Sequence, residues 1–282
     1  MKDLVLHELT ESQLGAYQAK PTHAVALIGP SGSGKRTLAI NLAEDTLGIS
    51  SFDDNAYTLI IESDEGKAIG IEAVRQLEQF LALKVPGKTA YDRAIIIEDA
   101  HLMTTEAQNA LLKTLEEPPE GTILILTASH EQSLLPTIRS RAQSIPVNKP
   151  NRDTLTDYFG KDFGSGQVKQ AYAISGGLPG LMNALLSEED HPLVLATEKA
   201  RQVLSSNAYE RLLMVDELAK QKALAADTTF ILQQMAHVSL QTVTGPAATK
   251  WQTVLAASYK ASEALANSAQ PKLTLTNLML SL

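Results

Sequence analysis

The sequence contains no cysteine among its 282 residues. Disulfide bonds and zinc sites built from cysteine are therefore excluded outright. Aromatic residues make up only 5% of the chain, and no apolar run reaches the length that a membrane-spanning helix needs. The N-terminal stretch MKDLVLHELTESQ lacks the apolar centre of a signal peptide, so we expect a cytoplasmic protein without a membrane partner.

Positive charge is also scarce, because 24 lysines and arginines face 32 acidic residues and the net charge is −8. Proteins that hold DNA through their own surface usually carry a basic excess or a basic stripe. The acidic balance argues against this chain as a main DNA contact, but it is compatible with membership of a DNA-handling complex. The apolar content of 44% is typical of a soluble globular protein, and the length allows one large domain or two to three small ones.

The first half of the chain alternates strand and helix patterns. Five short runs predict strands: AVALIG (24–29), YTLIIE (57–62), RAIIIE (93–98), TILILTA (122–128) and QSIPV (143–147). Helical runs lie between them, and the one in TTEAQNALLKTLEEP begins after a capping Thr104 and ends before Pro118 and Pro119. This alternation predicts an α/β fold, with a parallel five-stranded sheet covered by helices on both faces.

The pattern changes around NKPNRD (148–153), and no convincing strand follows. The run QVKQAYAISGGLPGLMNALL predicts two short helices that are broken at Gly176 and Gly177. From about residue 190 the chain is helical in pattern, with a break at TVTGPAA. We therefore expect three domains, at residues 1–149, 150–188 and 189–282.

The stretch GPSGSGKRT follows the first predicted strand and opens a helix, which is the setting of a P-loop. Backbone N–H groups and the helix dipole attract phosphate there, and Lys35 would reach the β- and γ-phosphates. The other interpretation is a glycine turn without a ligand. The candidate nucleotide-binding residues are Gly29, Pro30, Ser31, Gly32, Ser33, Gly34, Lys35, Arg36 and Thr37.

The loop departs from the P-loop pattern at Arg36, where a serine or threonine hydroxyl normally binds Mg²⁺. A guanidinium only donates hydrogen bonds and is permanently cationic, so it cannot bind the metal. We expect Arg36 to turn outward and water to complete the metal shell. Thr37 lies about 100° further round the helix and could touch the α-phosphate. The loop thus predicts bound ATP or ADP, with Mg²⁺ possible through the nucleotide and hydrolysis in doubt.

An acidic pair, Glu98 and Asp99, ends the strand IIIEDAHLM. In NTPases the first acid holds Mg²⁺ and the second orients the attacking water, usually in the order Asp then Glu. The order is inverted here, and the shorter Asp99 reaches its water less well. The other interpretation is two surface acids at a strand end. We expect His101 to cap or pack.

The segment EDAHLMTTEAQNALLKTLEEPPEGTILILTA, followed by PTIRSRAQSIPV, resembles the AAA+ clamp-loader subunits of bacterial DNA polymerase III, most of all those of delta-prime type. Further matches are GKAIGIEAVRQLEQFLALK and LANSAQPKLTLTNLMLSL, so the resemblance covers essentially the whole chain. It implies an AAA+ P-loop domain, a small helical lid domain and an all-helical collar domain that closes a ring.

The resemblance also implies roles for single residues. Arg141, in the Ser-Arg-Cys motif of the family, would act as an arginine finger in a neighbouring subunit's ATP site, although a local salt bridge is the alternative from sequence alone. Ala142 replaces the family cysteine, and Ser129 falls at the sensor-1 position. Gly180 or Leu181 stands where ATPase members have the sensor-2 arginine. The four-cysteine zinc module of some members is absent, so no zinc is expected.

Three functions remain open on these grounds. The first is a delta-prime-like ring member of the clamp loader that hydrolyses little or no ATP, donates Arg141 in trans and helps load the sliding clamp onto primed DNA. Its partners would be gamma/tau-type and delta-type subunits, the clamp and, through the complex, DNA. The second is an active gamma-type ATPase motor. The third is a free-standing P-loop NTPase, which has no use for a trans-acting arginine.

Overall fold

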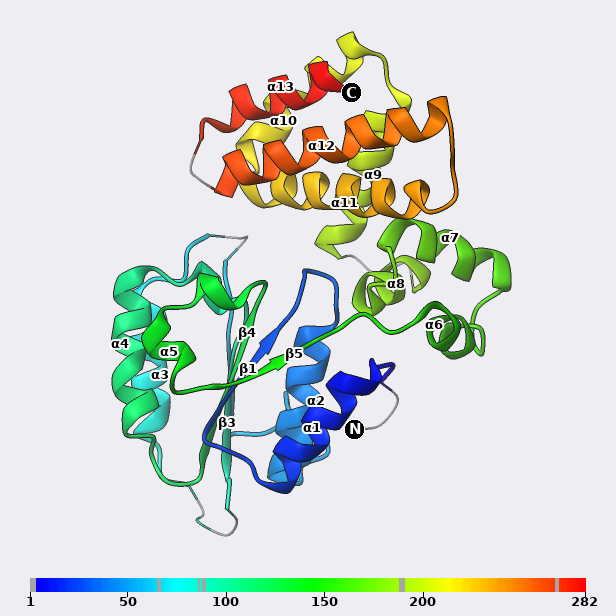
Figure 1. Ribbon diagram of the computed structural model, residues 1–282. Helices are drawn as coiled ribbons and strands as arrows, with labels where there is room; N and C mark the ends of the chain where they lie inside the picture. Colours follow the sequence, from blue (N-terminus) through cyan, green and yellow to red (C-terminus); the bar gives the residue numbers. More distant parts are fainter. Residues whose placement is uncertain (1–3, 65–66, 86, 88–89, 188–190, 267–268) are drawn as a thin grey trace. The chain divides into compact units, whose positions relative to one another are not determined.

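The computed structural model describes residues 4–64, 67–85, 87, 90–187, 191–266 and 269–282 (Figure 1). The chain divides into two compact units, Met1–Pro150 and Asn151–Leu282. The predicted boundary between lid and collar domains, at residues 188–189, lies outside the described residues. The division into three domains therefore stays a prediction.

The first unit is built on a parallel sheet of five strands, as the sequence predicts. The strands are β1 (Ala24–Ile28), β2 (Thr58–Ile61), β3 (Arg93–Ile97), β4 (Thr122–Ala128) and β5 (Gln143–Pro146). Their order across the sheet is β2-β3-β4-β1-β5, and every neighbouring pair is parallel. The carboxyl ends of β3, β4 and β1 therefore lie side by side at one edge, where ligands bind in open α/β sheets.

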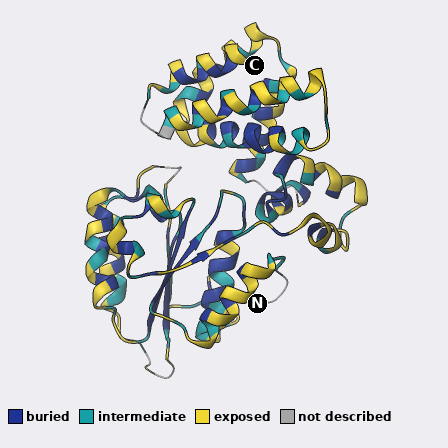
Figure 2. Cartoon of the chain, viewed as in Figure 1, coloured by how far each residue is buried: buried dark blue, intermediate teal, exposed yellow. Residues whose placement is uncertain are grey.

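Helices cover both faces of this sheet (Figure 1). One face carries α1 (Glu8–Ala19) and α2 (Lys35–Leu47), and the other carries α3 (Ile71–Leu81), α4 (Thr105–Glu116) and α5 (Pro136–Arg139). Successive strand residues face opposite sides, so Ile96 packs with α1 and α2 while its neighbour Ile95 packs with α3 and α4. Two separate cores result, and the central strands β3, β4 and β1 between them are almost entirely buried (Figure 2).

The ends of α4 and α2 follow the expected signals. The Thr104 hydroxyl accepts a hydrogen bond from the Ala107 N–H at 3.2 Å, which confirms the predicted cap. Helix α4 ends at Glu116, before the two prolines. Helix α2 begins after Gly34 and ends before Gly48, and both glycines have the left-handed conformation that suits a residue without a side chain.

Among the described residues of the second unit, helices are the regular secondary structure, and turns and loops join them. The helices are α6 (Arg152–Phe159), α7 (Ser165–Ser175), α8 (Pro179–Leu186), α9 (Pro192–Ser205), α10 (Ala208–Lys220), α11 (Lys222–Leu240), α12 (Pro246–Ala266) and α13 (Pro271–Ser281). The predicted break at Gly176 and Gly177 is confirmed, with φ angles of 62° and 81°. Within the described ranges, no helix is long and apolar enough to cross a bilayer.

Candidate phosphate-binding site

The loop from Gly29 to Gly34 joins β1 to α2 at the carboxyl edge of the sheet. The Gly29 N–H donates to the Ala128 carbonyl of β4 at 3.0 Å, which fixes the start of the loop. A Cβ atom at Gly29 would lie 2.8 Å from the Val147 carbonyl oxygen, so any other residue would collide with backbone. Gly32 and Gly34 have φ angles of 74° and 86°. These three glycines allow the tight turn that exposes N–H groups at the start of α2.

Lys35, the first residue of α2, is folded back over this loop and is only 7% exposed. Its ammonium donates to the carbonyl oxygens of Gly29 at 2.8 Å and Pro30 at 3.0 Å. Burial lowers the pKa of Lys35, and the nearby Asp99 and Glu98 carboxylates partly oppose this effect. Among the described residues, no carboxylate makes a hydrogen bond with the buried ammonium, so an anionic ligand would compensate its charge.

Ser33 adds a buried polar side chain to this loop. Its side chain is buried, and its hydroxyl makes no hydrogen bond to any residue that the structure describes. Buried hydroxyls are usually hydrogen-bonded, so an orphaned one in a glycine-rich loop points to a ligand. The buried ammonium, the orphaned hydroxyl and the exposed N–H groups together fit the phosphates of a nucleotide.

The predicted acidic pair lies beside this loop, at the carboxyl end of β3. The Glu98 N–H donates to the Ile61 carbonyl of β2 at 2.8 Å, and the Asp99 N–H donates to the Thr127 hydroxyl of β4 at 2.9 Å. Asp99 adopts a left-handed conformation with a φ of 46°, which aspartate tolerates better than most residues. Glu98 contacts Arg36, the residue after the loop lysine, so the acidic strand end lies beside the start of α2.

Arg36 is turned toward the acidic ends of two strands, so the expectation that it points outward is wrong. One of its terminal nitrogens, Nη1, donates to the Glu62 carboxylate at 2.5 Å and also to the Glu98 carboxylate. The reason is electrostatic, because two carboxylates at the ends of the neighbouring strands β2 and β3 attract a permanent cation. Burial lowers the pKa of Arg36, but its contacts with Glu62 and Glu98 outweigh this and raise the pKa overall.

The residues present do not fit a magnesium site of the usual kind. Glu98 is the predicted metal acid, and its carboxylate is already engaged by the Arg36 guanidinium. Burial raises the pKa of Glu98, and Arg36 partly reverses this. Among the described residues, no group of three or more histidines and carboxylates gathers as a metal-binding cluster. A divalent cation would have to displace a fixed positive charge at the one acid best placed to bind it.

Ser129 and His101 lie at the same edge of the sheet. Ser129 follows β4, which runs between β3 and β1, and its hydroxyl lies 3.0 Å from Nδ1 of His130. His101 lies in a short 3₁₀ helix, η1 (Ala100–Leu102), with its Nδ1 3.8 Å from the Asp99 carboxylate. Burial lowers the pKa of His101; Asp99 opposes this, while Lys35 and His130 add to it. The histidine is partly buried, and the capping or packing role expected for it stays a prediction.

Arg141 lies away from the loop, between α5 and β5. Its guanidinium donates to the Glu116 carboxylate at 2.6 Å, to the Thr137 carbonyl at 3.0 Å and to the Ser140 hydroxyl at 3.2 Å. None of these partners belongs to the phosphate loop. The local salt bridge that the sequence left open is therefore present, and its side chains are 34% and 51% exposed.

Two site residues escaped the sequence reasoning. Glu62 directly follows β2, so its place beside the Glu98 strand end could have been inferred from the predicted parallel sheet. Glu116 lies at the end of α4, and nothing in its sequence context indicates that it pairs with Arg141. Both residues hold an arginine, and both contacts join segments that are at least 25 positions apart.

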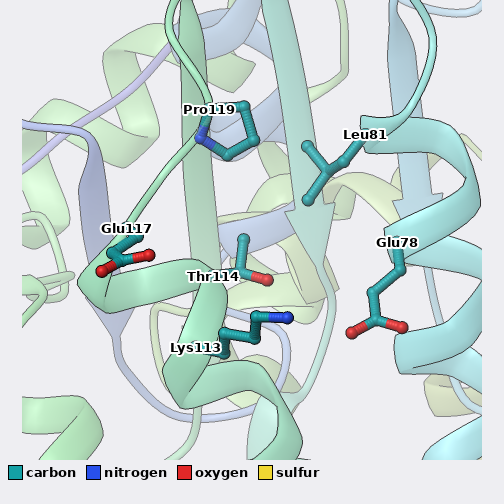
Figure 3. A pocket seen from close by; sticks show the side chains of 6 residues that line it. All are labelled: Glu78, Leu81, Lys113, Thr114, Glu117 and Pro119. Atoms are coloured by element: carbon teal, nitrogen blue, oxygen red, sulfur yellow. The ribbon is translucent and has the colours of Figure 1, made fainter.

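A separate hollow of about 310 Å³ lies between α3 and α4 (Figure 3). Helix α3 contributes Glu78 and Leu81, and the end of α4 and the segment after it contribute the rest. The full lining is Glu78, Leu81, Lys113, Thr114, Glu117 and Pro119. It includes no residue of the phosphate loop or of the acidic pair, so it forms no part of the candidate site.

Comparison with solved structures agrees with this arrangement. A DNA polymerase III gamma subunit-related protein from Thermotoga maritima matches 97% of this chain and 98% of its own, with a TM-score of 0.52. At 24% identity, that likeness shows the fold alone. With the strand order and the phosphate loop, it defines a P-loop protein of the α/β class with a parallel five-stranded sheet, as the sequence predicts.

A family model described as DNA polymerase III, delta subunit, matches residues 7–151, just over half of the chain. The chain therefore belongs to this family. The curated delta-prime subunits of Pseudomonas aeruginosa and Escherichia coli are 30% identical over 190 residues and 31% identical over 136 residues. The predicted resemblance to delta-prime-type clamp-loader subunits is thus confirmed. A gamma/tau subunit from Mycobacterium tuberculosis is 33% identical over 140 residues.

The Pseudomonas aeruginosa match covers 60% of this chain and 56% of the relative. The Escherichia coli match covers 48% of this chain and 40% of the relative, and the Mycobacterium tuberculosis match covers 44% and 24%. The chain thus spans less than two thirds of the length of each curated relative that it matches here.

Proposed function

We propose that this chain is a delta-prime-like member of the clamp-loader ring of DNA polymerase III. In this role it hydrolyses little or no ATP, donates Arg141 to the ATP site of a neighbouring subunit and helps load the sliding clamp onto primed DNA. The observation that carries the non-motor part is the contact between Arg36 and Glu98. The partners would be gamma/tau-type and delta-type subunits and the clamp, with DNA reached through the assembled complex in the cytoplasm.

Loss of hydrolysis follows from the chemistry of phosphoryl transfer. The reaction needs a divalent cation between the phosphates and a base that positions water, and each is worth orders of magnitude in rate. Here a guanidinium engages the metal acid, and the water-positioning role falls to the shorter Asp99. A nucleotide held by the loop N–H groups and Lys35 would therefore stay intact.

Arg141 suits a role outside its own chain. Its charge is permanent, and its planar fork matches the oxygens of a phosphate. Its partners lie on α4 and α5 and not in its own phosphate loop. An exposed pair with Glu116 is worth only about 0–1 kcal/mol, so it can exchange for a phosphate in trans. Residues 150–188 and 189–282 would supply the lid and the collar that hold the ring together.

The alternative is an active gamma-type motor, and the intact phosphate loop favours it. The left-handed turn at Gly34 and the position of Lys35 over the loop support this alternative. Curated gamma/tau relatives match the chain at an identity similar to that of the delta-prime ones. A motor would need Arg36 to leave Glu98 when nucleotide and metal bind.

ATP turnover by the reconstituted complex separates the two functions. The complex contains this chain, a gamma-type subunit, a delta-type subunit, the clamp and primed DNA. Arg141→Ala is expected to abolish the share of turnover from the neighbouring site, since losing an arginine finger costs roughly 10³-fold there. Lys35→Ala is expected to leave turnover unchanged.

Arg75→Ala is the matched control, because Arg75 also pairs with a glutamate, Glu72, on the surface of the same unit. It should behave like the wild type. If Lys35→Ala removes a share of turnover, the chain is a motor. If Arg141→Ala and Arg75→Ala both leave turnover unchanged, Arg141 is no finger.

A further inference from the structure

We infer that the phosphate loop binds the diphosphate group of a nucleotide without a divalent cation, with the Arg36 guanidinium in the position of the metal. The inference rests on the proposed function in one respect, since it concerns the same non-hydrolysing site. It goes further by naming the ligand's chemical form, which is a metal-free nucleoside diphosphate or triphosphate.

The position of Arg36 carries the inference. Arg36 comes from the first turn of α2, directly after the loop lysine, and its Nη1 joins Glu98 after β3 to Glu62 after β2. In a P-loop site, the residue after the lysine and the acid of this strand share one metal ion. Here the same two positions are joined directly by a positive side chain. No gap for a metal ion separates them.

The unused donors of Arg36 supply the second step. A guanidinium has five N–H donors in a planar fork. Among the described residues, only Nη1 of Arg36 has a hydrogen-bond partner, which leaves the donors of Nε and Nη2 available. Such donors bind phosphate oxygens readily, and a bidentate contact of this kind is strong and specific. Arg36 can therefore connect the acids to the ligand, as a metal ion does in other sites.

The charges of the site point the same way. Arg36 is already paired with Glu62 and Glu98, whereas no carboxylate of the described residues makes a hydrogen bond with the buried Lys35 ammonium. A metal-free diphosphate is more anionic than its magnesium complex, so it compensates the Lys35 ammonium better. Magnesium bound beside Arg36 would be repelled by the guanidinium and would find Glu98 already paired.

The Ser33 hydroxyl shows that the loop itself is built for a ligand. It is 5% exposed, makes no hydrogen bond within the described part of the chain and lies inside the turn, 3.1 Å from where a Gly29 Cβ would be. This hydroxyl, the Lys35 ammonium and the loop N–H groups bind phosphate oxygens directly. None of them needs a metal ion for that contact.

Calorimetric titration of the full chain with ADP tests the inference, once with excess Mg²⁺ and once with EDTA. For the wild type, the dissociation constants of ADP with Mg²⁺ and with EDTA are expected to agree within about threefold. In Arg36→Thr, a hydroxyl replaces the guanidinium, and Mg²⁺ should then strengthen ADP binding by at least about fivefold, the lower end of ordinary coupling between two ligands. Lys35→Ala should abolish binding in both conditions.

Arg75→Thr is the matched control and should keep the metal-independent binding of the wild type. Thermal unfolding of each variant without ligand verifies that it is folded. Manganese used as a paramagnetic probe gives an independent readout, since it should broaden the phosphorus resonances of ADP bound to Arg36→Thr but not those of ADP bound to the wild type.

The outcomes separate this inference from the proposed function. Absence of ADP binding in both conditions overturns the inference and leaves a non-motor subunit standing. Binding by the wild type only with Mg²⁺, without turnover in the complex, also overturns the inference alone. Binding only with Mg²⁺, together with turnover that Lys35→Ala removes, overturns both.

Discussion

Lys35 carries a charge that the fold buries before any ligand is present, and this makes the stability of the chain depend on pH. Burial lowers its pKa in the folded state, with Asp99 and Glu98 opposing. In the unfolded chain, the lysine keeps its ordinary pKa of about 10.4. Between the two values the unfolded state binds more protons, so the free energy of unfolding rises with pH there.

Lys35→Met removes this contribution. We expect the free energy of unfolding of the variant, minus that of the wild type, to decrease as the pH rises toward the ordinary lysine pKa of about 10.4, because only the wild type gains stability there. Urea unfolding of the chain without nucleotide, at a series of pH values, measures the difference. Lys113→Met, at an exposed position of α4, is the control and should show a flat difference. A flat line for Lys35→Met as well would mean that the ammonium is not buried in solution.

The contacts of two arginines could not be predicted from the sequence. Arg93 begins a strand in an apolar run, yet its side chain is buried. Its guanidinium donates to the carbonyls of Phe80, in the last turn of α3, and of Leu83, just after that helix. Arg36 turns toward two acids that are 26 and 62 positions away. Both contacts depend on which distant segments the fold brings together, and local patterns do not carry that information.

At the scale of elements, α4 connects the acidic strand to the arginine of the proposed finger. It starts at the Thr104 cap, just after η1, and ends at Glu116, whose carboxylate holds Arg141. One face packs on the sheet through Ala107, Leu111 and Leu115. The helix therefore fixes the position of Glu116 relative to the sheet through its packing.

Thr104→Ala removes the cap of α4 and is expected to destabilise the chain by about 1 kcal/mol, since the Ala107 N–H loses its acceptor. Chemical denaturation followed by circular dichroism measures the loss. Thr105→Ala makes the same chemical change one residue later, where the exposed side chain is not the cap. Equal losses in the two variants would show that the cap contributes nothing.

The strands and long helices were predictable because their signals are local. Short β-rich runs, three of them continuously apolar, placed all five strands, and threonine, glycine and proline placed the ends of α4 and the break between α7 and α8. Helices α1, α5 and α6 were not predicted. Helix α5 has only four residues, too few for a periodic pattern, so tertiary contacts such as that of the buried Ile138 decide it.

At the scale of the molecule, the hydrophobic cores belong to one unit or the other. The two cores around the sheet use residues of the first 150, and the third core uses only residues from Ile174 onward. No core found in the described part of the chain draws on both units. Independent cores of this kind generally unfold as separate cooperative units.

The single tryptophan makes this separation measurable. Trp251 lies in α12 and packs against the core of the second unit, so its fluorescence reports on that unit. Leu232→Ala creates a cavity in the same core, and Leu124→Ala creates one beside the sheet of the first unit; both leucines are fully buried. Each change should cost about 2–5 kcal/mol in its own unit.

We expect Leu232→Ala to lower the urea midpoint reported by Trp251 fluorescence. We expect Leu124→Ala to leave that midpoint unchanged and to shift part of the transition seen by circular dichroism to lower urea concentration. The difference arises because each cavity removes contacts from one core only. If both variants shift the Trp251 midpoint equally, the units unfold as one, and a change near the phosphate loop can then alter the stability of the helical unit.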